Sequence, residues 1–139
     1  MVYQSIRPGQ VWLDTNGSRI QAHGGSLFYE DDTYYWYGEN KEKTVPGSGV
    51  WQWGVRCYAS HDLYNWEDKG LIIPPDLDNP ASPLHPASKL DRPHIIYNAS
   101  TGKYVCWVKI MEPDGQQRST ILTADALLGP YAIVRTGYQ

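Results

Sequence analysis

Two carboxylates in this sequence have surroundings in which they could do chemistry. Glu39 follows an aromatic run at residues 34–37, and Asp91 immediately precedes Arg92. A carboxylate placed beside apolar groups can bind a ligand's hydroxyl groups or exchange a proton with a ligand. The simpler alternatives are a solvated glutamate in a Glu-Asn-Lys loop and a turn aspartate paired with Arg92. The residues alone leave both alternatives open.

His23 and Trp51 are further candidates for contact with a ligand. His23 is flanked by an alanine and two glycines, and the missing side chains let a ligand or another strand come close. Trp51 and Trp53 lie in a Gly-rich insertion, where an indole face either stacks on the apolar face of a sugar or covers the strand beneath it. There is no H-E-x-x-H motif and no cluster of His or Cys, so the sequence predicts neither a metal nor a cofactor.

The composition indicates what kind of elements position these residues. The 139-residue chain contains 11 Tyr, 6 Trp and 1 Phe, together with 13 Gly and 10 Pro. Each Gly or Pro inside a helix would cost about 1–3 kcal/mol, so helix bundles and coiled coils are excluded. An aromatic-rich chain with many turn residues is typical of an all-β protein.

The expected strands follow an internal repeat. Residues 24–39 hold an apolar run, a polar turn and an aromatic run, and residues 92–109 hold the same series. Each copy continues into two further β-like runs, at 55–60 and 71–73 in the first and at 119–124 and 132–134 in the second. Four hairpin-linked strands, repeated, are typical of β-propeller blades. The alternative is a simple meander or sandwich whose hairpins are alike by chance.

We therefore predict a partial propeller domain over residues 1–139, with blade one at about 20–75, a crossover at 76–90 and blade two at about 91–139. A closed propeller needs about four to eight blades. Two blades leave strand edges unpaired, and such edges can pair with another chain. We therefore expect an incomplete propeller that is able to self-associate through its open blade edges.

Charge and hydropathy argue against two classes of partner. Twelve basic and 15 acidic residues give a net charge of −3, and the densest basic segment, 41–43, contains its own glutamate. Neither nucleic acid nor an anionic membrane is expected as a partner. No stretch approaches the ~18 consecutive apolar residues of a membrane span.

Compartment and redox state are less constrained. The first eight residues lack the apolar segment of a signal peptide, and localisation stays unknown. Cys57 and Cys106 have no C-x-x-C spacing, so two buried free thiols are favoured over a disulfide, which would need an oxidising compartment.

A series of motifs is similar to the branch of glycoside hydrolase family 43 that contains the exo-β-1,3-galactanases. In chain order they are V-W-L-D-T-N-G (11–17), I-Q-A-H-G-G (20–25), Y-W-Y-G-E-N-K (35–41), S-H-D-L-Y-N-W (60–66), D-R-P-H-I-I-Y-N (91–98) and G-P-Y (129–131). Each motif alone is weak, whereas the ordered set is specific and spans most of the chain. The resemblance implies a five-bladed propeller with a central funnel, of which this chain holds about two blades.

The resemblance also implies roles for individual residues. It implies that Glu39 hydrogen-bonds a terminal galactose and that Asp91 modulates the pKa of a general acid, which lies on a third blade outside this chain. The base aspartate that most of the family carries on the first blade has no counterpart in the motif around Gln21 and His23. Those two residues and Trp51 are predicted to contact substrate.

The resemblance implies an O-glycosyl hydrolase that releases galactose from the non-reducing end of β-1,3-galactan, with inversion. Inverting hydrolysis needs a protonated acid and a base on opposite faces of the sugar, and this chain is expected to lack the acid. A galactan-type polysaccharide or oligosaccharide is the implied partner. The alternatives are a non-catalytic carbohydrate-binding propeller fragment and a truncated product that folds only in part.

Overall fold

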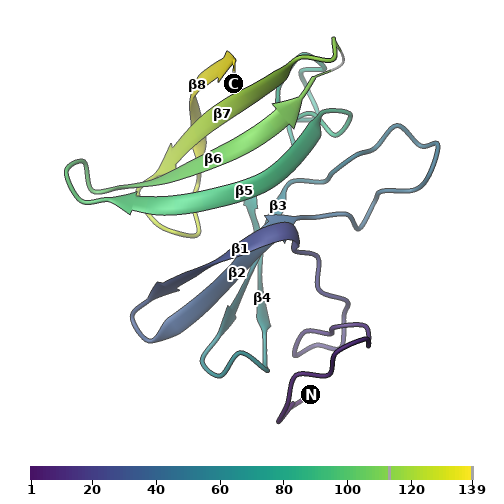
Figure 1. Cartoon of the computed structure of the whole chain (residues 1–139), viewed down its shortest axis with the longest axis vertical. Helices are drawn as coiled ribbons and strands as arrows, with labels where there is room; N and C mark the ends of the chain where they lie inside the picture. Colours follow the sequence, from purple (N-terminus) through teal and green to yellow (C-terminus); the bar gives the residue numbers. More distant parts are fainter. Residues whose placement is uncertain (113, 139) are drawn as a thin grey trace.

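The computed structural model describes residues 1–112 and 114–138, which form eight β-strands in two four-stranded antiparallel sheets (Figure 1). The first sheet contains, in order, β1 (His23–Glu30), β2 (Thr33–Glu39), β3 (Val55–Ser60) and β4 (Glu67–Ile73). The second contains, in order, β5 (Lys89–Asn98), β6 (Lys103–Met111), β7 (Gln117–Ala124) and β8 (Ala132–Tyr138). The described residues include no helix, and hence none that could cross a membrane. The predicted all-β fold with two blade-like sheets is confirmed.

Local sequence explains the tight connections between the first strands of each sheet. Asp31 and Asp32 join β1 to β2 with φ values of 50° and 56°, the left-handed conformation required at both central positions of a type I′ hairpin turn. Aspartate tolerates this conformation better than most side chains. The corresponding turn between β5 and β6 uses Gly102, with φ of 68°. Both turns keep neighbouring strands in antiparallel register.

The main core lies between the two sheets, where β1 and β2 face β5. The hydroxyl of Tyr37, a fully buried residue, accepts a hydrogen bond from the backbone N–H of Ile95 at 2.7 Å and so joins β2 to β5. Cys57 and Cys106 are both buried here as free thiols, as the sequence predicted. Burial raises the pKa of each thiol to about 12, so neither is reactive at neutral pH.

The outer faces of the two sheets differ. On the first sheet, Trp36 packs between Trp12 and Trp66, with ring centroids 4.9 and 5.3 Å away, and Trp66 is only 2% exposed. The N-terminal segment therefore covers part of this face (Figure 1). On the second sheet, Ile96 and Trp107 are each 46% exposed. Trp36 and Trp66 of the first sheet's face are therefore used in packing, whereas Ile96 and Trp107 of the second sheet lie open to solvent.

The two long connections support each other at one end of the sheets. The insertion at 40–54 links β2 to β3, and the crossover at 74–88 links β4 to β5. Gln52, fully buried, donates from its amide to the carbonyls of Leu84 at 3.1 Å and His85 at 2.9 Å. These bonds fix the insertion against the crossover beside the start of β5.

Candidate functional site

The glycines beside His23 allow close packing of backbone against backbone. A Cβ on Gly25 would lie 2.2 Å from the carbonyl oxygen of Tyr37, and one on Gly38 would lie 2.4 Å from the carbonyl carbon of Ala22. The backbone of β2 therefore occupies the space beside Gly25. This contact brings the start of β1 against the end of β2, where His23 pairs in register with Glu39.

Glu39 is held in a defined position at this junction. The residue is only 3% exposed. One carboxylate oxygen accepts a hydrogen bond from the backbone N–H of Arg92 at 3.3 Å, and the other lies 3.1 Å from the ammonium of Lys41. The interpretation of Glu39 as a solvated loop residue is wrong, because its carboxylate is buried between the two sheets.

The surroundings of Glu39 change its proton affinity. Burial, followed by the neighbouring carboxyl of Asp91, raises the pKa of Glu39 and Lys41 lowers it, and the net result is a pKa of about 7. Burial disfavours the ionised form, and a second carboxylate disfavours it too. Glu39 therefore changes between a hydrogen-bond donor and an acceptor near neutral pH.

Asp91 reaches this junction because the backbone of β5 is irregular there. The pairing of β5 with β6 breaks between Asp91 and His94, and Arg92 has φ of 52°. Such a bulge re-aims side chains and backbone groups, and here it turns the N–H of Arg92 towards Glu39. Among the ion pairs of the described residues, none joins Asp91 to Arg92.

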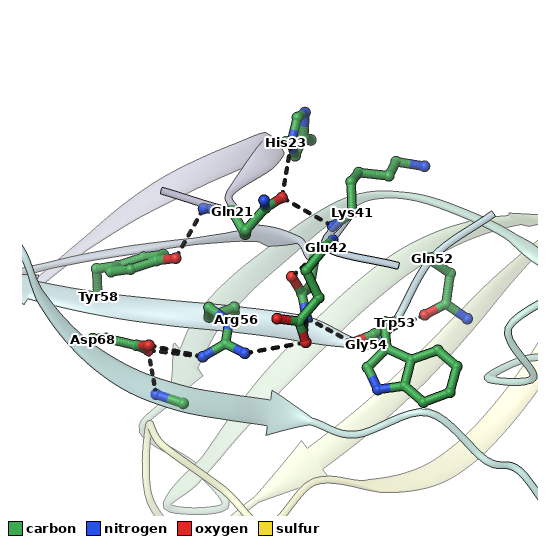
Figure 2. Close-up of polar contacts among 12 residues, drawn as sticks. Gln21, His23, Lys41, Glu42, Gln52, Trp53, Gly54, Arg56, Tyr58 and Asp68 are labelled. Atoms are coloured by element: carbon green, nitrogen blue, oxygen red, sulfur yellow. Dashed lines mark hydrogen bonds and ion pairs between the residues drawn. The ribbon is translucent and has the colours of Figure 1, made fainter. Parts of the chain in front are cut away.

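Gln21 connects His23 to the loop after Glu39. The side-chain oxygen of Gln21 lies 3.2 Å from Nε2 of His23 and accepts a hydrogen bond from the backbone N–H of Lys41 at 3.2 Å (Figure 2). The backbone N–H of Gln21 donates to the hydroxyl of Tyr58 at 2.8 Å. Partial burial, with the positive charges of Arg19 and Lys41, lowers the pKa of His23. His23 is therefore neutral at neutral pH and able to exchange hydrogen bonds with a ligand.

The pocket beside His23 is separate from the carboxylate pair. A cavity of about 240 Å³ lies between the N-terminal segment and the outer face of the first sheet, and its lining includes Trp12, Arg19 and Trp36. Neither Glu39 nor Asp91 lines it. The two carboxylates instead lie where the two sheets meet.

The other predicted residues lie around the junction or away from it. Trp51 is 37% exposed and its indole N–H donates to the carbonyl of Leu90, so it lies beside the carboxylates. The remaining histidines have other hydrogen-bond partners: His61 contacts the carbonyl of Asp32, His85 accepts the N–H of Ala87, and His94 contacts Ser26 of β1. No group of His, Cys, Asp and Glu in the described part of the chain has the arrangement of a metal site.

Sequence reasoning missed two groups at this junction. The ammonium of Lys41 could have been found, because Lys41 stands two residues after Glu39 in the Y-W-Y-G-E-N-K motif. The N–H of Arg92 could not, because its direction depends on a left-handed backbone conformation at a non-glycine residue, which no pattern in this sequence indicates.

Neither the family models nor the curated proteins gave a match to this sequence. Solved structures do match. A family 43 β-1,3-galactosidase with galactodeoxynojirimycin is 34% identical, with a TM-score of 0.82 over 95% of this chain and 38% of its own. The exo-β-1,3-galactanase of Clostridium thermocellum is 36% identical, with a TM-score of 0.76 over 94% of this chain and 27% of its own. Over 94–95% of its own length, the chain is therefore similar in sequence and fold to part of these glycoside hydrolase family 43 enzymes.

Other family 43 structures extend the comparison. The exo-β-1,3-galactanase of Phanerochaete chrysosporium, in its structure with galactose, is 29% identical, with a TM-score of 0.83 over 94% of this chain and 29% of its own. The chain thus spans between 27% and 38% of the length of these three structures. The family 43 neighbours are five-bladed propellers, so the two sheets correspond to about two blades. The family resemblance inferred from the ordered motifs is confirmed.

Proposed function

We propose that this chain is the substrate-binding front portion of a glycoside hydrolase that releases galactose from the non-reducing end of β-1,3-galactan with inversion. The pair formed by the buried Glu39 and the half-buried Asp91 carries this proposal, because it lies where β1 and β2 of one sheet meet β5 of the other. The first strands of propeller blades surround the central channel. Structures of the fungal relative contain galactose and β-1,3-galactotriose.

Within this proposal, Glu39 binds the terminal galactose through a hydroxyl group. Its carboxyl group is held by Lys41 and by the N–H of Arg92, so it is positioned before a sugar arrives. Fixed polar groups in a mostly apolar site favour one ligand orientation. Gln21 and His23, which hydrogen-bond each other, provide neighbouring polar contacts.

Asp91 acts at a distance in the same proposal. An ionised carboxylate raises the pKa of a nearby acid and so keeps that acid protonated for transfer to the leaving oxygen. We place that general acid outside this chain, on a third blade. Asp91 then supplies charge, while another residue supplies the proton.

We also propose blade boundaries at about 20–75 and 91–139, joined by a crossover at about 76–90, of which residues 76–88 lie in the observed connection between β4 and β5. An isolated two-blade chain would associate with itself, because each sheet has open strand edges and the second sheet exposes apolar residues, including Ile96 and Trp107. Exposed apolar side chains on one face favour association with another molecule.

The proposal is tested by incubating the 139-residue chain with β-1,3-galactan and measuring both retention of the protein on the polysaccharide and release of galactose. We expect retention without release. Release of galactose by this chain would contradict the placement of the general acid outside it. A folded chain that is not retained would contradict the substrate assignment.

A further inference from the structure

The ammonium of Lys41 has three fixed partners at the junction of the two sheets. It lies 3.1 Å from the carboxylate of Glu39, donates to the carbonyl of Trp51 at 2.6 Å, and stands 4.1 Å above the centre of the Trp51 indole. The Lys41 side chain is 19% exposed, so much of its hydration shell is replaced by these groups. A surface lysine usually moves freely, whereas this one is confined.

Trp51 is in turn attached to the second sheet. Its indole N–H donates to the carbonyl of Leu90 at 3.2 Å, and its backbone N–H donates to the carbonyl of Pro86 at 2.8 Å. Leu90 directly precedes Asp91 in β5. The Trp51 indole therefore fixes the backbone next to Asp91, while the Lys41 ammonium above the indole holds Glu39.

The continuous series of contacts runs from Glu39 through Lys41 and Trp51 to Leu90, from the end of β2 to the start of β5. We propose that Lys41 and Trp51 are positioning residues, which together connect the two sheets and fix the spacing of the two site carboxylates. Because Lys41 occupies space above the Trp51 ring, that face is not free to stack on a sugar. Support of the site, rather than stacking, is the role this geometry gives to Trp51.

The charges around Glu39 come from three elements. Lys41 contributes a positive charge from the insertion and Asp91 a negative one from β5, and the neutral His23 is the Cα partner of Glu39 in β1. Lys89 stands 5.5 Å from the centre of the Trp51 ring and adds a weaker positive charge to the same region. Removal of Lys41 therefore leaves the Glu39 carboxyl without its ion-pair partner.

The test is the titration of the Glu39 carboxyl carbon by NMR in the 139-residue chain labelled with 13C-glutamate, assigned by its loss in Glu39→Gln. Lys41→Met is expected to raise the apparent pKa of Glu39 by about one unit. Trp51→Leu leaves the charge in place but removes its support, and is expected to raise the same pKa by less. Substitutions of two residues that act through one contact have non-additive effects. The Glu39 pKa of the double variant should therefore resemble that of Lys41→Met alone.

Lys43 and Trp53 provide a matched control. The Lys43 ammonium lies 4.0 Å above the Trp53 ring within the same insertion, and the contacts of Glu39 do not include this pair. Lys43→Met and Trp53→Leu should leave the Glu39 titration unchanged. An equal rise with Lys43→Met would show that net charge alone is responsible and would overturn the proposal.

Two further results would overturn it: a Glu39 titration unchanged by Trp51→Leu, or full additivity in the double variant. If circular dichroism shows that Trp51→Leu does not fold, Trp51→Phe is measured instead. Phenylalanine keeps a ring beneath the ammonium but loses the hydrogen bond to Leu90, and it too must raise the Glu39 pKa. The inference rests on the proposed roles of the two carboxylates, but its readout needs no sugar, so failure of sugar binding and failure of this connection are separate results.

Discussion

Replacement of Glu39 by glutamine should remove a pH dependence of stability that the wild-type chain shows between about pH 5 and 8. The pKa of Glu39 rises from an ordinary value of 4.5 to about 7 on folding. The folded chain therefore holds a proton that the unfolded chain releases across this range. Stability from this group is fully present below pH 4.5 and is lost as pH rises through 7.

The size of the effect follows from the same two values. A difference between 4.5 and about 7 corresponds to an upper limit of about 3 kcal/mol in the free energy of unfolding. His23 has the opposite sign, because its pKa is lowered in the folded chain and its contribution grows as pH rises. Since both proteins contain His23, the comparison between them isolates Glu39.

The assay is urea unfolding at pH 5 and pH 8, followed by tryptophan fluorescence. From pH 5 to pH 8, we expect the free energy of unfolding of the wild type to fall by up to about 3 kcal/mol more than that of Glu39→Gln. The exposed Glu67 supplies a matched control, and Glu67→Gln should behave as wild type. Identical pH dependence in the wild type and Glu39→Gln would refute the reasoning that Glu39 is buried and protonated near neutrality.

Three other changes test the packing. Tyr37→Phe leaves a buried backbone N–H of β5 without its acceptor and should lower the free energy of unfolding by about 1–3 kcal/mol; an effect no larger than that of Tyr29→Phe, on an exposed residue, would contradict this. Gly25→Ala places a Cβ 2.2 Å from a carbonyl oxygen and should destabilise the chain by about 1–3 kcal/mol in urea unfolding. Gly137→Ala meets no atom within 4 Å, and equal effects of the two changes would argue against close packing at Gly25. Sedimentation velocity should show concentration-dependent association that Trp107→Lys weakens; a wild type that stays monomeric at all concentrations would contradict it.

Much of the fold could be predicted from the sequence because its signals are local. Aromatic runs alternating with turn residues gave the strands, and the Glu30–Thr33 turn contains two aspartates that tolerate the left-handed conformation. The internal repeat then indicated two similar sheets. Free thiols at Cys57 and Cys106 were favoured because the sequence has neither a C-x-x-C spacing nor a sign of an oxidising compartment.

The geometry of the site was less predictable because it depends on contacts between distant residues. Glu39 and Asp91 could be named from motifs, but their interaction depends on the bulge at Arg92 and on the packing of β2 against β5. The sequence left Trp51 equally open to stacking on a sugar and to covering a strand. Its contacts with Lys41 and Leu90 join residues that no short spacing connects.

Binding of a sugar at the carboxylate pair is the central claim, and titration of the chain with β-1,3-galactobiose, followed by NMR, tests it most directly. We predict saturable shifts in resonances of Glu39, Gln21 and His23. Glu39→Gln should weaken binding, whereas Lys43→Met should bind as wild type. No saturable shift in a folded chain, or unchanged binding by Glu39→Gln, would contradict the assignment of this junction as a galactose site.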